Sequence, residues 1–332
     1  MPALRTVKNI IHALEKAEGV GAHVRRSIGV RAARNFTPFL MLDHFASGGP
    51  GGFPQHPHSG QETITYIMKG AMAHEDFTGS KGILYSGDLQ FMTAGKGVVH
   101  SEMPIPNEDG SPTVGLQLWV DLPEHLKDVE PRYRDLRAWE IPEVVQQDGR
   151  LRIKVISGKG YGIESIKELA YTPVNYYHYQ MKPGSHFRQE LQNDFNYFLY
   201  VLKGNSLVLN NDTQAKQHHN LFFDVDGDAV EGVNPESGED VEFVIIGGQK
   251  LDQEIVQNGP FVATSKDGIK KAFVDYQYAQ NGFENLRSWK SLISNGVSEE
   301  MIQGPLDGNL EKREQTKNAY LAKHKNHEND EL

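Results

Sequence analysis

Two short segments of the chain carry side chains that can bind a metal ion. His56 and His58 are separated by one proline in GGFPQHPHSGQET, and His100 and Glu102 have the same spacing in GKGVVHSEMP. Residues two apart in an extended strand project from one face, so each pair can converge on one ion. Three neutral imidazoles and one carboxylate suit a divalent first-row metal, and on ligand type alone iron, nickel, copper, manganese and zinc are all acceptable. If the two strands face each other, the spacing predicts a mononuclear site with open coordination positions.

A single pair of this kind is more often a surface or hydrogen-bonded pair of histidines than a metal site. The second pair shifts the balance toward metal binding. The chain has no cysteine, so any metal site must be built from nitrogen and oxygen ligands. Glycines bracket both pairs, where tight turns between barrel strands are expected. They are Gly51, Gly52, Gly60, Gly70, Gly87, Gly95 and Gly97.

The elements that would position these residues are predicted to be β-strands. Runs of apolar and β-branched residues, separated by glycine-rich turns, fill the region from about residue 36 to 120. This sequence pattern is typical of β-sandwiches and β-barrels. The same pattern returns from about residue 151 to 248. We therefore predict an all-β protein, mainly β with a few short helices, in which two barrels follow each other: a metal-binding domain of residues 1–137 and a metal-free domain of residues 138–300.

The rest of the chain is predicted to link or cover these barrels. The segment LPEHLKDVEPRYRDLRAWEIPEV is rich in charge and proline, which places the boundary near residues 135–145. After Gly248, apolar residues at helical spacing predict short helices that pack on the barrels. Residues 301–332 are mostly polar, and we interpret them as a polar extension or a surface helix.

Composition argues against several classes of function. The formal net charge of -10 disfavours direct binding to nucleic acid, which depends on lysine and arginine contacts to phosphates. No run approaches the ~18 apolar residues of a membrane span. The first residues lack the apolar core of a secretory signal, so a cytoplasmic location is expected.

The metal-binding segments resemble the pirin family, whose members are bicupins, that is, two cupin (double-stranded β-helix, jelly-roll) barrels. The similarity runs through FLMLDHF, GGFPQHPHSGQETITYIMKGAMAHED, GDLQFMTAGKGVVHSEMP and LQLWVDLP, resumes with GPFV and NGFENLRSWKS, and covers roughly residues 5 to 300. The family's iron ligands fall on His56, His58, His100 and Glu102. The resemblance thus implies Fe(II), with Ni, Cu, Mn, Co or Zn as alternatives.

The general cupin pattern would use a different carboxylate. In that pattern the glutamate lies four residues after the second histidine, which is Glu62 here. Because the resemblance is specifically to pirins, Glu102 is the expected ligand. Glu62 is left as a carboxylate that contacts the substrate or orients a ligand histidine by a hydrogen bond.

The second module does not repeat the ligand pattern. His186 lies in a similar context, but Arg188 stands two residues further on. His218 and His219 are adjacent, so on a strand they point to opposite faces. A metal-free second barrel is predicted, as the resemblance also implies. The acidic residues Asp224, Asp226 and Asp228 are predicted to form a turn, because the glutamate that completes a calcium loop is missing.

A substrate pocket beside the metal would be lined by residues that share a face with the ligands. The candidates are Phe53, Met72, His74, Phe91, Gln117 and Trp119. Ordinary core packing is an equal alternative for Met72, Phe91 and Trp119, and His74 is equally well explained as a hydrogen-bonded histidine.

Three functions are compatible with this site. The resemblance implies a flavonol (quercetin) 2,3-dioxygenase, which opens the flavonol's central ring with dioxygen and releases carbon monoxide, and in which Glu102 or Glu62 takes the proton of the 3-hydroxyl. The competing interpretation, also from the family, is an iron-dependent, redox-sensitive regulator that binds a transcription factor or a metabolic enzyme. In the third, the metal is only structural.

Overall fold

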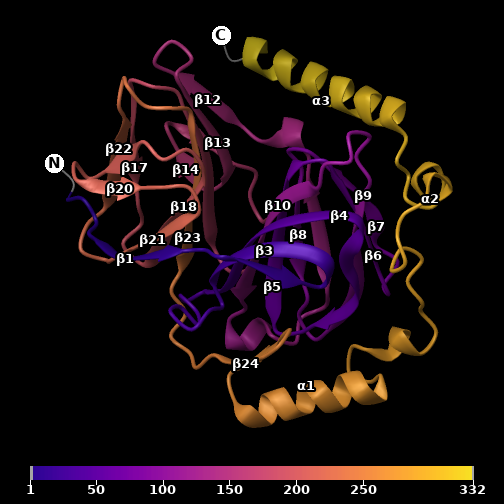
Figure 1. Ribbon diagram of the computed structural model, residues 1–332. Helices are drawn as coiled ribbons and strands as arrows, with labels where there is room; N and C mark the ends of the chain where they lie inside the picture. Colours follow the sequence, from indigo (N-terminus) through magenta and orange to yellow (C-terminus); the bar gives the residue numbers. More distant parts are fainter. Residues whose placement is uncertain (1–2, 331–332) are drawn as a thin grey trace.

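The structure, a computed structural model, describes residues 3–330, without the side chains of residues 49, 50 and 325–330. Figure 1 shows two β-barrels side by side, with helices on the outside of the first. The predicted all-β class with two tandem barrels is therefore confirmed.

The first barrel contains two sheets that share one long strand. In the larger sheet the order is β11-β8-β5-β10-β4, with β3 against β4 and β2 against β3, and the far end of β4 continues into the order β9-β6-β7. The strands are β2 (Glu15–Glu18), β3 (Val20–Ile28), β4 (Phe39–His58), β5 (Gln61–Lys69), β6 (Ala71–Asp76), β7 (Lys81–Tyr85), β8 (Leu89–Thr93), β9 (Val98–Ile105), β10 (Thr113–Asp121) and β11 (Arg132–Leu136).

The second barrel repeats this arrangement. Its sheets have the orders β1-β21-β18-β23-β16-β13-β12 and β17-β22-β19-β20. The strands are β1 (Val7–His12), β12 (Glu143–Gln146), β13 (Leu151–Ser157), β16 (Val174–Met181), β17 (Ser185–Glu190), β18 (Phe195–Lys203), β19 (Leu207–Leu209), β20 (Thr213–Ala215), β21 (His219–Phe223), β22 (Ala229–Asn234) and β23 (Val241–Gln249). The strand β1, from the start of the chain, thus completes the second barrel rather than the first.

The remaining elements are short, apart from two helices. They are the hairpins β14 (Lys159–Gly160) with β15 (Ile163–Glu164) and β24 (Val256–Asn258) with β25 (Phe261–Ala263), the 3-10 helices η1 (Glu124–Leu126), η2 (Ala138–Glu140) and η3 (Glu284–Arg287), and the helices α1 (Lys266–Tyr278), α2 (Glu299–Gln303) and α3 (Leu310–Asp330). Among the described helices, none has the length and apolar character needed to cross a bilayer.

Strand β5 shows how the sequence places residues on both faces of the first barrel. Ile64 and Tyr66 point outward into the apolar core between the barrels, where they meet residues such as Tyr176 and Phe198 of the second barrel. Thr63 and Thr65 alternate with them, and Thr65 faces the barrel interior. A strand covered on both faces has no exposed side, so β5 is buried almost throughout.

Two of the predicted turn glycines fix the ends of the metal-site strands. Gly60 and Gly95 both have positive φ, at 70° and 51°, and the Gly60 amide donates to the Gly95 carbonyl at 2.7 Å. A Cβ atom at Gly60 would lie 2.0 Å from the Val262 carbonyl oxygen, and one at Gly95 would lie 2.0 Å from that of Val129. Only glycine fits these positions.

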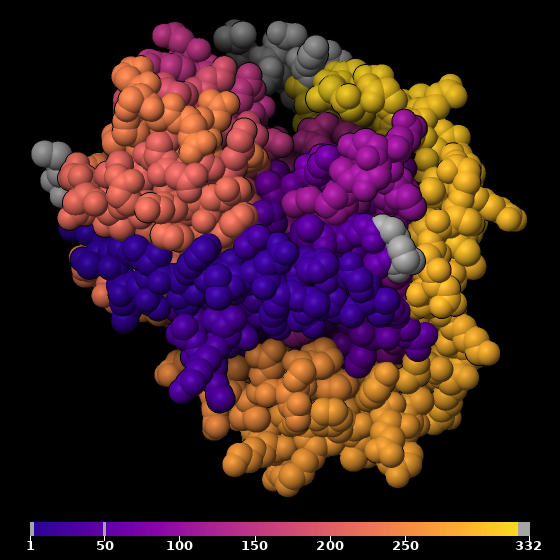
Figure 2. Space-filling view, viewed as in Figure 1, coloured from indigo at the N-terminus to yellow at the C-terminus, as the bar shows by residue number. Residues whose placement is uncertain are grey.

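The segments after residue 250 return to the first barrel. Figure 2 shows them covering its lower edge and one side. Val262 donates its amide to Ser59 at 3.1 Å, which holds the β24–β25 hairpin against the end of β4. Residues 301–330 form the end of α2 and the helix α3, as the prediction of an extension or surface helix allowed. The domain limits at residues 137 and 300 stay predictions.

Candidate metal centre

The three predicted histidine ligands converge inside the first barrel. Antiparallel pairing of β4 with β9 places His56 opposite His100. One ring nitrogen from each of His56, His58 and His100 lies within 4.8 Å of the others, and the Nε2 atoms of His56 and His100 are 2.9 Å apart. The spacing argument required facing strands, and the structure provides them.

Glu102 lies beside this group but slightly apart from it. The group of ligand atoms that lie within 4.8 Å of one another consists of one nitrogen from each histidine. No oxygen of Glu102 belongs to it. Its Oε2 is 3.8 Å from His100 Nε2, while Thr65 Oγ1 donates to its Oε1 at 3.2 Å and Gln117 Nε2 donates to its Oε2 at 3.5 Å. The carboxylate is buried and aimed at the imidazoles, held by two neutral donors.

Burial sets the protonation of these groups. It lowers the pKa of His56, His58 and His100, and neighbouring imidazoles lower it further for His58 and His100. The three rings are therefore neutral at pH 7, which is the form that binds metals. Burial raises the pKa of Glu102, against the opposing effects of His74 and Thr65.

The unmet hydrogen-bonding needs of the three rings fit a metal ion. Among the described residues, His58 Nε2 and His100 Nδ1 are buried without a hydrogen-bond partner. His56 Nδ1 contacts the Pro54 carbonyl at 2.7 Å, so its proton belongs there and its Nε2 lone pair faces His100. Buried polar atoms are normally satisfied, and a cation shared by His58 Nε2 and the facing Nε2 atoms of His56 and His100 would satisfy the first of these.

Glu62 does not join this group. Its Oε1 accepts from Thr93 Oγ1 at 2.7 Å and from the Tyr171 amide at 3.0 Å, and its Oε2 accepts from the Thr172 amide at 2.9 Å. The carboxylate thus ties the first barrel to the segment that leads into β16. Glu62 was considered as a residue that orients a candidate ligand histidine by a hydrogen bond. Gln61 makes this contact instead, because Gln61 Nε2 lies 2.9 Å from His58 Nδ1.

A cavity of about 950 Å³ opens onto the site. Four of the six predicted pocket residues line it, namely Phe53, Met72, Gln117 and Trp119. Trp119 meets His58 edge to face, with ring centroids 5.0 Å apart. The cavity wall also includes residues that sequence reasoning missed, because they come from distant segments: Arg26, Arg34, Asn35, Met41, Asp43, Phe45, Thr65, Ile255, Gln257 and Pro260.

The other two predicted pocket residues lie elsewhere. Phe91 packs in the core between the barrels. His74 does not line the cavity but lies further along β6, opposite Glu102, with its Nε2 3.7 Å from Asp135 Oδ2 and its ring stacked on Tyr133 at a centroid distance of 6.3 Å. His74 is thus not a lining residue, and as a hydrogen-bonded histidine it is incomplete, because Asp135 lies just beyond hydrogen-bond distance and His74 Nε2 has no such partner among the described residues.

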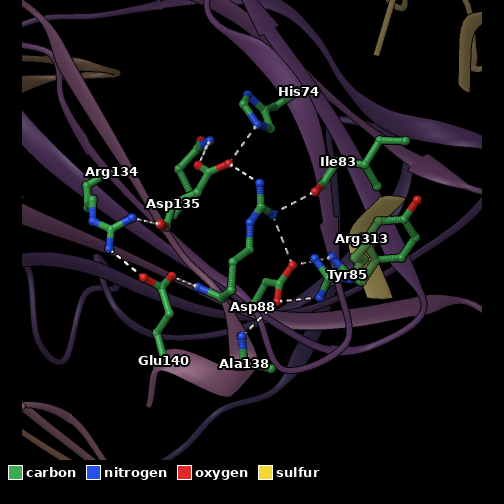
Figure 3. A network of polar contacts seen from close by, with 11 residues as sticks. His74, Ile83, Tyr85, Asp88, Arg134, Asp135, Ala138, Glu140 and Arg313 are labelled. Atoms are coloured by element: carbon green, nitrogen blue, oxygen red, sulfur yellow. Dashed lines mark hydrogen bonds and ion pairs between the residues drawn. The ribbon is translucent and has the colours of Figure 1, made fainter. Parts of the chain in front are cut away.

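Asp135 connects His74 to a polar network that anchors the last helix (Figure 3). Arg137 donates to Asp135 Oδ2 and to Asp88 Oδ2, each at 3.1 Å, and Arg313 of α3 donates to Asp88 Oδ1 at 2.8 Å. The Arg313 guanidinium also lies 4.6 Å from the Tyr85 ring centroid. The predicted polar extension is thereby attached to the first barrel.

Aromatic side chains occupy much of the interior of the second barrel, beside a cavity of about 550 Å³ lined in part by Tyr177 and Gln189. Tyr179, Phe187 and Phe243 pack with ring centroids 4.9 to 5.1 Å apart. His186 is exposed, and its backbone amide donates a hydrogen bond to Gln147 Oε1 at 3.1 Å.

His218 and His219 pack against other histidines, and two of the three acidic residues considered above have polar partners. His218 packs near His44, and His219 packs near His12. Asp224 pairs with Lys8, and Asp226 accepts from the Thr6 amide at 2.9 Å. The acidic turn therefore holds the start of the chain beside the second barrel.

The two barrels with one cluster of buried imidazoles define a bicupin protein. The Pirin family model matches residues 21–120, and the model of the Pirin C-terminal cupin domain matches residues 176–282. The chain is 43% identical to Pirin of Homo sapiens over 284 residues, which are 85% of this chain and 95% of that protein. The chain belongs to the Pirin family.

Solved structures show the same fold. A quercetin 2,3-dioxygenase from Acinetobacter baumannii is 27% identical, with a TM-score of 0.77, over 85% of this chain and 99% of that one. The bacterial pirin YhhW from Escherichia coli, in complex with nickel(II), is 20% identical, with a TM-score of 0.56, over 76% of this chain and 100% of that one.

Proposed function

We propose that this Pirin-family protein is a metal-dependent flavonol 2,3-dioxygenase that holds one Fe(II) ion through His56, His58, His100 and Glu102. The observation that carries the proposal is the convergence of three neutral imidazoles, two of which, His56 and His58, line a cavity of about 950 Å³. Cavities of ~300–1,000 Å³ are typical of sites for small organic ligands. A purely structural metal site would not need such a cavity.

The protein and the metal would divide the chemistry. A bound divalent metal supplies Lewis-acid and redox chemistry toward a hydroxyl-bearing substrate and dioxygen. Glu102 is the carboxylate beside the imidazoles that would take the proton from the flavonol 3-hydroxyl. Thr65 and Gln117 hold that carboxylate in place.

The cavity wall would orient the planar substrate. Phe53, Met72 and Trp119 offer apolar surface, and Trp119 contacts a ligand histidine directly. Such walls bury aromatic rings and exclude water from the reacting atoms. The 27% identity to a quercetin 2,3-dioxygenase supports the same substrate class.

The test is turnover of quercetin by protein whose iron content has been measured. Iron-loaded protein in air should consume flavonol and dioxygen in equal amounts, and metal-free protein should not. His58→Ala should abolish both signals, whereas the control His186→Ala changes an exposed histidine of the second barrel and should not. Fully loaded wild-type protein that leaves quercetin unchanged would refute the proposal.

A second candidate is an iron-dependent regulator that uses the same ligands to control a protein contact. The identity to human Pirin, at 43%, exceeds the identity to the dioxygenase, at 27%, and this favours keeping that alternative. Protein that binds iron through the four residues and shows no flavonol turnover would support the regulator.

A further inference from the structure

The rim of the metal cavity carries a cation whose charge no described carboxylate neutralises. Arg34 and Asn35 line the cavity from the loop between β3 and β4. Both side chains are exposed. Within residues 3–330, Arg34 has no ion pair, hydrogen bond or ring contact.

The other arginine of the cavity is in a different state. Arg26 donates to both oxygens of Asp43 at 2.7 Å and to Glu18 at 2.8 Å. Its charge is therefore already matched within the protein. Arg34 is left as the cation that a ligand could use.

The loop that presents Arg34 is fixed on both sides. The Gly29 amide donates to the Ala33 carbonyl at 2.8 Å, and Phe36 and Phe39 exchange backbone hydrogen bonds of 2.8 and 2.9 Å. Phe36 also packs edge-on against Phe222, with ring centroids 5.0 Å apart. A backbone held in this way presents a side chain at little further entropic cost on binding.

We propose that Arg34 binds an anionic substituent, a carboxylate or a sulfur oxyanion, at the end of an aromatic substrate remote from the metal. The planar guanidinium suits such groups because it offers paired donors to two oxygens. The adjacent Asn35 amide adds a neutral donor at the same rim. This inference rests on the proposed function, since it assumes that the ring system of the substrate reaches the imidazoles.

Binding without turnover tests this assignment. Quercetin and quercetin-5′-sulfonate are titrated into iron-loaded protein under anaerobic conditions, and the two dissociation constants are compared. The wild-type protein should bind the sulfonate about threefold to fivefold more tightly, the upper range for an exposed ion pair. The preference should shrink in high salt, because exposed charges are screened.

Two variants and one control separate Arg34 from general electrostatics. Arg34→Gln should bring the ratio of dissociation constants close to one, and Arg34→Glu should reverse the preference. The control Arg31→Gln removes an exposed arginine of the same loop that does not line the cavity, and it should keep the wild-type preference. Equal loss in Arg31→Gln and Arg34→Gln, or an unchanged preference in Arg34→Gln, overturns the assignment.

A simpler probe distinguishes failure of this inference from failure of the proposed function. If neither flavonol binds, 2-naphthalenesulfonate is titrated into the same proteins. Weaker binding to Arg34→Gln than to Arg31→Gln then supports the anion site while the flavonol substrate is rejected. Equal binding to both variants, or no binding to wild-type protein, rejects the anion site as well.

Discussion

The two barrels have strands in the same order and differ in what fills them. In the first, β4 and β9 place His56 opposite His100. In the second, the matching strands β17 and β22 place Phe187 opposite Gly232. One barrel keeps a cavity of about 950 Å³ beside imidazoles, and the other has stacked aromatic rings in its interior and a smaller cavity of about 550 Å³. Function therefore follows the inward-facing residues and not the strand topology.

This difference bears on how the interior of each barrel contributes to stability. A buried aromatic side chain contributes about 1.5–3 kcal/mol through removal of its surface from water. A buried polar atom without a partner costs about 1–3 kcal/mol, and both barrels hold such atoms among the described residues, for example His58 Nε2 in the first and the Tyr176 hydroxyl in the second. The rings of the second barrel thus stabilise the molecule, and a metal bound at His58 would add to the stability of the first barrel.

The strongest test of this comparison is the removal of one ring from the second barrel. Phe243 is completely buried between Tyr179 and Phe187, so Phe243→Ala should lower the free energy of unfolding by about 3–5 kcal/mol. Urea denaturation measures the loss. The control Val233→Ala alters an exposed residue of β22 and should change stability little.

Metal content sharpens the same test. Folded Phe243→Ala should still bind one iron ion, because none of the four proposed ligands lies in the second barrel. Loss of iron at wild-type stability would show that the barrels do not divide their roles in this way.

Metal addition should act on the first barrel alone. Binding to the native state stabilises it by about 2.7 kcal/mol when the free metal is at a hundred times the dissociation constant. Thermal or urea unfolding with and without Fe(II) should show this gain in wild-type protein and in His186→Ala, and lose it in His58→Ala. An equal gain in His58→Ala would place the binding site elsewhere.

Local patterns predicted the strands and the convergence of the histidines, because alternation along a strand decides which residues share a face. They could not decide which face lines the cavity. Phe91 fits the alternating pattern of β8. It pairs with Ile64, however, and both side chains lie on the strand face that packs against the second barrel. The position along a strand was equally undecided, because His74 shares a face of β6 with Met72 but only Met72 reaches the cavity.

The sequence patterns also could not predict contacts between segments that are far apart in the chain. The pairing of β1 with β21 joins residues separated by most of the chain. The cavity mouth formed by Ile255, Gln257 and Pro260 depends on a segment that leaves the second barrel and returns to the first. Spacing and periodicity report on a few neighbouring residues, so they carry no signal for such returns.

The attachment of α3 offers a smaller effect that also belongs to the first barrel. Arg313→Ala removes a charged donor from the fully buried Asp88 and a cation from the rings of Tyr85 and Trp139. A loss of about 2 kcal/mol in the free energy of unfolding is expected. The control Lys317→Ala removes only an exposed pair with Glu314 and should lie within about 0.5 kcal/mol of wild type. Equal effects of the two changes would mean that Arg313 contributes no more than a surface charge.

The smallest expected effect concerns His44, which lies where the barrels meet. Its Nδ1 is 3.3 Å from the Tyr200 hydroxyl. Burial, followed by the charges of His218 and Arg25 and opposed by Glu242, lowers the pKa of His44 from 6.5 to about 4. The unfolded chain therefore binds a proton at higher pH than the folded protein does, so this residue makes stability fall as the pH is lowered from 6.5 to 4.

Replacing His44 should remove part of this acid sensitivity. His44→Gln cannot take up a proton, so its stability should fall less between pH 6.5 and 4, by about 1 kcal/mol once the partial exposure of the side chain is considered. Urea midpoints at several pH values, compared with the exposed control His23→Gln, measure the difference. Parallel pH curves for wild type and His44→Gln would show that His44 does not titrate in this range. The acid sensitivity of the protein would then come from other groups.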